Sequence, residues 1–159
     1  MSEEQAQQQF AIQKIFLKDV SFESPNSPGV FTEAEWKPEV NVQINTETAA
    51  ISEGMHEVTL SVTVTAKQLE KTAFLVEVKQ AGIFLMTGFK EEQMGGMLGA
   101  YCPEALFPYA REAISELVTK GGFPQMLLSP VNFNALYMQH QQQAQQEKAG
   151  QAAAAETAH

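Results

Sequence analysis

The chain has 159 residues, 44% of them hydrophobic, and a formal net charge of −9 from 19 acidic and 10 basic residues. This much apolar sequence suffices for one modest core, so we expect a single domain. The acidic balance argues against a nucleic-acid partner, because binding to phosphate backbones depends on lysine and arginine side chains.

The sequence also shows no pattern typical of a membrane span or of a signal peptide. No run approaches the roughly 18–20 apolar residues of a membrane span, and residues 1–9 are acidic and glutamine-rich. Cys102 is the only cysteine, so an internal disulfide is excluded and an oxidising compartment is not indicated. We therefore expect a cytoplasmic protein with no direct membrane insertion and a disordered leader over residues 1–9.

The first predicted strand covers residues 10–23, where apolar and polar residues mostly alternate. The apolar side of this strand is predicted to hold Phe10, Ile12, Phe16, Val20 and Phe22. Asp19, Ser21 and Glu23 have the opposite parity and are predicted to face outward. Residues 24–29 concentrate prolines, serines and a glycine, so the chain is expected to leave the sheet there and form a loop as far as Pro38.

Three more strands are predicted over residues 40–45, 58–65 and 74–79. The first alternates valine and isoleucine with polar residues, as is typical of an antiparallel strand with one wet face. The last two fit a hairpin in which Leu75, Glu77 and Lys79 point outward. Beyond Gly82 both parities become apolar, which predicts a strand end covered on both faces.

The period then changes to that of helices. Residues 106–117 carry a helical apolar face and end at Gly121 and Gly122, while residues 91–102 are predicted to be a separate, glycine-weakened piece with a kink at Pro103. Asn132 or Asn134 can cap a final helix that runs through His140. We expect a domain over residues 10–147 and a disordered tail over residues 148–159. The order predicts an α+β fold, a four-stranded antiparallel sheet followed by two helices.

Catalytic and metal-binding patterns are weak. The sequence has no glycine-rich phosphate loop, no nucleophile elbow and no closely spaced cysteines or histidines, so we predict no enzyme activity, no metal site and no cofactor. Cys102 lies among apolar residues without a neighbouring base, which favours a buried and inert thiol. The adjacent Glu91 and Glu92 fit a solvated first helical turn.

Two features stand out from this background. If their strands pair, Asp19, Glu23 and Glu77 form an acidic patch beside an exposed Leu75, although a merely solvated face fits the same pattern. Trp36, Phe133 and Tyr137 lie in predicted loops or at the start of the last helix, where aromatic side chains either line a binding groove or cap the sheet edge.

Several long strings resemble the SecB family of protein-export chaperones. They are residues 18–26 (KDVSFESPN), 99–103 (GAYCP), 106–111 (LFPYAR) and 129–133 (SPVNF), in family order over residues 10–137. The chain departs from the family pattern at Gly96 and Met97, where a histidine and a cysteine are frequent, and at Asn134, where an aspartate is frequent. These departures concern helix packing and capping.

The resemblance implies a homotetramer arranged as a dimer of dimers that acts as an ATP-independent holdase. Such a chaperone binds unfolded preproteins in apolar grooves and delivers them to the SecA motor for export through the Sec translocon. By position, Asp19, Glu23, Leu75 and Glu77 match the residues of the family that contact the zinc-bearing C-terminal tail of SecA. The zinc belongs to SecA. Trp36, Phe133 and Tyr137 are our candidates for the client groove.

The same pattern permits two other classes of function, an adaptor module and a small enzyme. An adaptor module of the same fold would bind one short motif, whereas a holdase binds many unrelated unfolded proteins. A small enzyme would need a convergent nucleophile, base and orienting group, and the sequence offers none.

Overall fold

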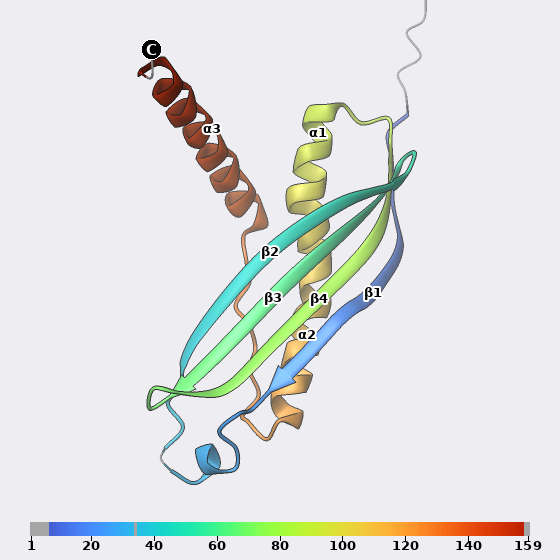
Figure 1. The fold of residues 1–159 in the computed structure, drawn as a ribbon. Helices are drawn as coiled ribbons and strands as arrows, with labels where there is room; N and C mark the ends of the chain where they lie inside the picture. The colour runs from blue at the N-terminus through green and yellow to red at the C-terminus, as the bar shows by residue number, and fades with distance from the viewer. Residues whose placement is uncertain (1–6, 34, 158–159) are drawn as a thin grey trace, which may run out of the picture.

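The computed structural model describes residues 7–33 and 35–157. Four long strands form one antiparallel sheet, and helices follow them in the chain, which confirms the predicted α+β fold (Figure 1). The strands are β1 (Gln9–Glu23), β2 (Glu39–Ser52), β3 (Met55–Gln68) and β4 (Lys71–Thr87), with a short 3-10 helix η1 (Gly29–Phe31) after β1. The helical part consists of α1 (Glu91–Gly96), a π-helical turn η2 (Met97–Tyr101), α2 (Cys102–Lys120) and α3 (Phe133–Thr157).

The strand order is β1-β4-β3-β2, so β1 and β2 are the two edges of the sheet. The strands are longer than predicted because both hairpins close tightly, through residues 53–54 and 69–70. Gly54 takes a φ of 76° in the first of these turns, a conformation that glycine adopts without a steric penalty.

Two register shifts in β1 interrupt the simple alternation that the sequence predicted. The register against β4 shifts between Ile12 and Lys14 and again between Leu17 and Asp19. Each shift reverses which face the following residues occupy, since side chains alternate along a strand. Phe16 pairs with Ala81 and therefore lies on the opposite face from Phe10 and Phe22, so its predicted position was wrong.

The core lies between the sheet and α2, which covers β4 and β3 (Figure 1). Phe74, Leu60, Leu106 and Ile114 are fully buried there. At the end of β4, Phe84 is also fully buried, but Ile83 and Leu85 on the other face remain half-exposed. The prediction that this end is covered on both faces is therefore confirmed for the face under the helices and stays a prediction for the other face.

The helical segment is continuous from Glu91 to Lys120. The irregularity that we placed at Pro103 lies just before it, in η2, where the Cys102 N–H donates to the Met97 carbonyl five residues earlier. Asn132 caps α3, since its Oδ1 accepts a hydrogen bond from the Ala135 N–H at 3.0 Å.

Helix α3 continues to Thr157, whereas we predicted disorder from residue 148. Alanine and glutamine are strong helix formers, which accounts for the helical backbone. Every residue from 138 to 157 is exposed. Residues 138–157 thus add nothing to the core.

The leader predicted over residues 1–9 lies mostly outside the described residues.

Candidate functional site

Two adjoining hollows run along edge strand β2 on the helix-facing side of the sheet. The first, of about 410 Å³, lies between β2, the α1–η2 segment and the start of α3. The second, of about 580 Å³, lies between β2, α2 and the loop of residues 126–131. Both are lined by Ile44 and Leu136, so together they form one groove.

The two ends of this groove differ in chemistry. The aromatic end, the first hollow, is lined by Phe133, Tyr137 and His140 opposite Thr46 and Thr48. The aliphatic end, the second hollow, is lined by side chains that include Val40, Val42, Phe107, Met126, Leu127 and Val131. None of the described residues that line either hollow is aspartate, glutamate, lysine or arginine.

The aliphatic end exposes side chains that would ordinarily be buried. Val40 and Val42 are 45% and 41% exposed, and Leu127 is 70% exposed. Exposed apolar side chains gathered around a hollow favour a binding function, because burying them on an apolar partner is worth about 25 cal/mol per Å². The groove is thus an uncharged, apolar channel beside a sheet edge.

The structure places two of the three predicted groove residues in the groove. Phe133 is buried, its ring lies 5.6 Å from that of Phe107, and it fixes the start of α3. Tyr137 follows one helical turn later and lines the aromatic end.

Trp36 lines neither hollow. Its ring packs 5.3 Å from Phe123 and 6.5 Å from Phe74, in an aromatic cluster that also includes Phe22 and Phe31. For this residue, capping of the sheet fits the geometry better than groove lining.

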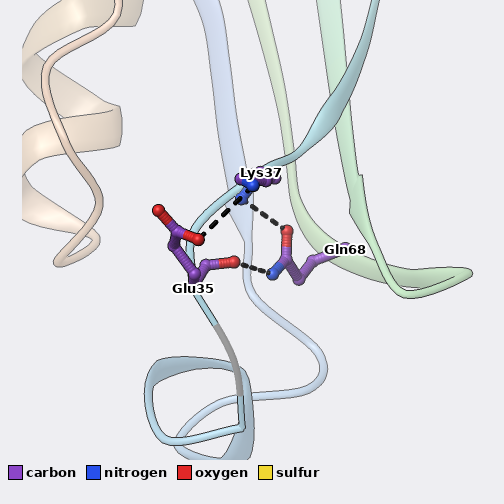
Figure 2. Close-up of polar contacts among 3 residues, drawn as sticks. All are labelled: Glu35, Lys37 and Gln68. Carbon is purple, nitrogen blue, oxygen red and sulfur yellow. Dashed lines mark hydrogen bonds and ion pairs between the residues drawn. The ribbon is translucent and has the colours of Figure 1, made fainter.

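The backbone on both sides of Trp36 is held by the buried Gln68, as Figure 2 shows. The Gln68 Nε2 donates to the Glu35 carbonyl at 2.7 Å, and its Oε1 accepts from the Lys37 N–H at 3.0 Å. A surface ion pair between Lys37 Nζ and Glu35 Oε2, 3.4 Å long, lies over this arrangement. The amide therefore fixes the loop that presents Trp36 to its aromatic neighbours.

The groove residues of β2 and of the 126–131 loop were missed by the sequence analysis. Val40, Val42 and Ile44 belong to the predicted strand of residues 40–45, and Met126 to Leu128 form an apolar run that predicts no particular structure. Alternation alone does not indicate that β2 is an edge strand. The apolar positions of β2 were therefore identified, but whether they are core or groove could not be decided from the sequence.

The opposite face of the sheet brings all four predicted acidic-face residues together. Glu23 pairs with Leu75, Ser21 with Glu77, and Asp19 with Lys79, and paired residues point to the same side. Asp19 and Glu23 are exposed, while Leu75 and Glu77 are half-exposed. We call Asp19, Glu23, Leu75 and Glu77 the acidic face.

The structure adds two contacts to the acidic face. Thr63 on β3 donates a hydrogen bond from Oγ1 to Glu77 Oε2 at 3.1 Å, which orients that carboxylate. Lys79 lies opposite Asp19, so a cation borders the patch on one side.

Groups suited to catalysis or to metal binding do not converge in the described residues. No three His, Cys, Asp or Glu side chains there are grouped to hold a metal ion. Cys102 is fully buried at the start of α2, and burial raises the pKa of its thiol to about 12 from an ordinary 9.0. The thiol therefore stays protonated at neutral pH, which agrees with the predicted inert cysteine. Within residues 7–33 and 35–157 no helix is long and apolar enough to cross a membrane.

Comparison with known proteins gives a consistent result. Residues 3–144 match the family model described as preprotein translocase subunit SecB. The chain is 61% identical over 145 residues to the protein-export protein SecB of Nitrosococcus oceani, covering 91% of this chain and 88% of that one. It is 60% identical over 149 residues to that of Methylococcus capsulatus, covering 92% and 96%.

A solved structure shares the fold at much lower identity. It is a Mycobacterium tuberculosis SecB-like chaperone in complex with a ChAD peptide from an antitoxin. The TM-score is 0.64 at 16% sequence identity, covering 77% of this chain and 90% of that one.

Proposed function

The chain belongs to the SecB family of protein-export chaperones, which are not enzymes, and from that premise we propose that it acts as an ATP-independent holdase. It binds unfolded preproteins in the cytoplasm, keeps them competent for translocation and delivers them to the SecA motor for export through the Sec translocon. The observation that carries the client-binding part is the uncharged groove along β2.

The dimensions of the groove suit an extended polypeptide. Its β2 wall runs from Val40 to Thr48, which at strand rise is about 26 Å, the length of roughly eight extended residues. Successive side chains on one side of an extended chain are about 7 Å apart, so several of them can enter the two hollows at once.

The edge position of β2 supplies a second mode of recognition. In the described residues β2 pairs only with β3, so its other side offers unpaired backbone N–H and C=O groups beside the groove. A client strand can hydrogen-bond to these groups whatever its sequence, while its apolar side chains fill the hollows. This combination gives broad selectivity for unfolded, apolar segments.

Holding a client in this way needs no ATP. A ligand that binds only the unfolded state lowers the fraction that folds by mass action. Slow-folding clients stay exposed long enough to be captured, and fast-folding proteins escape.

The acidic face supports the proposed delivery to SecA. Three carboxylates around Leu75 offer both attraction for the basic, zinc-bearing tail of SecA and an apolar contact. Because it lies on the other side of the sheet from the groove, a loaded chaperone can still present it.

We further propose that the chain assembles as a homotetramer, a dimer of dimers. Tyr101 and Tyr109, which are 50% and 48% exposed along the helical segment, offer apolar surface for such contacts. Light scattering at micromolar concentration should give the mass of four chains. A monomeric mass would contradict the assembly.

A refolding assay tests the holdase. An unrelated slow-folding protein is diluted from denaturant with and without stoichiometric chain and no nucleotide, and we expect refolding to stop. A chain that stops no unrelated protein, and binds only one short motif, would be an adaptor instead.

A further inference from the structure

Tyr137 lies directly on bare backbone of the helical segment opposite. Gly95 lies in the last turn of α1 and Gly99 lies in η2, four residues later, and the Tyr137 ring of α3 packs across both. All three residues also line the aromatic end of the groove. The contact therefore belongs to the wall of the hollow.

Glycine is required at both positions for this contact. A Cβ on Gly95 would lie 2.5 Å from the Tyr137 Oη but 3.7 Å from Cζ, so only the hydroxyl obstructs it. A Cβ on Gly99 would lie 2.6 Å from Cε2 of the ring itself. The adjacent Gly96 differs, because a Cβ there would meet nothing within 4 Å.

The space available to a client depends on how closely the Tyr137 ring packs against Gly95 and Gly99. Tyr137 is only half-buried, and its side chain lines the hollow of about 410 Å³ together with the two glycines. A methyl group at either glycine pushes the ring, with the first turns of α3, toward that hollow and fills part of it.

We propose that Gly95 and Gly99 are specificity-determining positions that act through Tyr137. By seating its ring on backbone, they keep the aromatic end wide enough for a bulky aromatic side chain of the client. This inference deepens the proposed client-binding function and rests on it. The glycines are positioning residues, since their effect on the client passes through the tyrosine.

The test compares two peptides on four variants. The probes are fluorescein-labelled peptides of alternating serine and valine with one central residue, phenylalanine in the first and alanine in the second. On the wild-type chain we expect the phenylalanine peptide to bind more tightly by fluorescence anisotropy, because its ring enters the aromatic end.

Gly95→Ala should lower the affinity for the phenylalanine peptide about tenfold, since an ~1.4 kcal/mol loss of aromatic burial corresponds to that factor. The alanine peptide, held by the aliphatic end and the strand edge, should change less than about twofold on the same scale. Gly96→Ala is the matched control and should behave as wild type with both peptides.

Tyr137→Phe removes the obstructing hydroxyl. Added to Gly95→Ala, it should restore the preference for the phenylalanine peptide to the level of Tyr137→Phe alone, which is the reference for the double variant and also lacks the hydrogen bond from Gln141 Nε2. A general weakening of the helix by Gly95→Ala would not be rescued in this way. Thermal melts of all four variants check that each is folded.

The outcomes separate the two proposals. If the folded wild-type chain binds neither peptide, the proposed client binding fails. If the wild-type chain prefers the phenylalanine peptide and Gly95→Ala leaves that preference intact, the proposed role of the glycines is wrong, while client binding stands. The same conclusion follows if Tyr137→Phe does not restore a preference that Gly95→Ala has removed.

Discussion

Strands β2 and β3 present the same kind of residue on the same face of one sheet, with opposite results. Val64 on β3 is fully buried, and its direct partner Val42 on β2 is 41% exposed. The difference arises because α2 packs over β4 and β3 and leaves β2 uncovered (Figure 1). An apolar strand face therefore becomes core where a helix covers it and binding surface where it stays uncovered.

The largest expected effect lies on the covered side. Leu60 on β3 is fully buried, so Leu60→Ala should lower the free energy of unfolding by about 2–5 kcal/mol through lost burial and the cavity left behind. Urea unfolding measures this change. A loss below about 1 kcal/mol would mean that β3 is no better covered than β2.

A matched pair of substitutions makes the comparison sharper. Val64→Thr buries a hydroxyl under α2 and should cost about 1–3 kcal/mol of stability. Val42→Thr places the same hydroxyl at the groove and should cost less than about 0.5 kcal/mol. In a client-binding titration, Val42→Thr should instead weaken affinity several-fold. Equal stability losses in the two variants would contradict the distinction between core and groove.

The acidic face should respond to charge and salt rather than to burial. Glu77→Lys exchanges attraction for repulsion and should weaken binding of a SecA C-terminal peptide, more at low salt than at high. The cost to folding should stay near 1 kcal/mol, the usual worth of the single hydrogen bond from Thr63. Leu75→Gln should also weaken binding, with little dependence on salt.

Titration calorimetry measures both variants, with thermal melts as the control. Wild-type affinity in both variants, with intact folding, would show that this face is only solvated.

The smallest effect, absent at neutral pH, concerns Cys102. Its pKa is about 12 in the folded protein against an ordinary 9.0, so only the unfolded chain releases this proton at moderately alkaline pH. The contribution of the thiol to stability is therefore complete below about pH 9 and is lost as pH rises toward 12. Cys102→Ala should flatten that part of the stability profile, and identical profiles would mean that the thiol is not buried.

Much of the fold was readable from local patterns. Alternation identified all four strands, the change of period identified α2, and Asn132 was one of two residues named as the cap of α3. The acidic face was also predicted by parity, because Asp19 and Glu23 follow the second shift in β1 and so keep their relative orientation.

The sequence-based predictions were wrong where an extra residue shifts the register of a strand or where a helical irregularity lies at another residue than expected. The shifts in β1 moved Phe16 to the other face, and η2 absorbed the irregularity expected at Pro103. The place of Trp36 in the client groove stays a prediction, since Gln68 holds its loop beside the aromatic cluster and Trp36 lines neither hollow described above.

The sequence by itself thus determined the strands, most of their faces and the family, because periodicity and short motifs depend only on neighbouring residues. Only the tertiary structure decided which apolar faces stay open. Val42 and Leu127 form one wall and rim of the groove although neither is distinguished in sequence from core residues. Their exposure depends on strand order and on where α2 ends, and these are set by contacts between residues far apart in the chain.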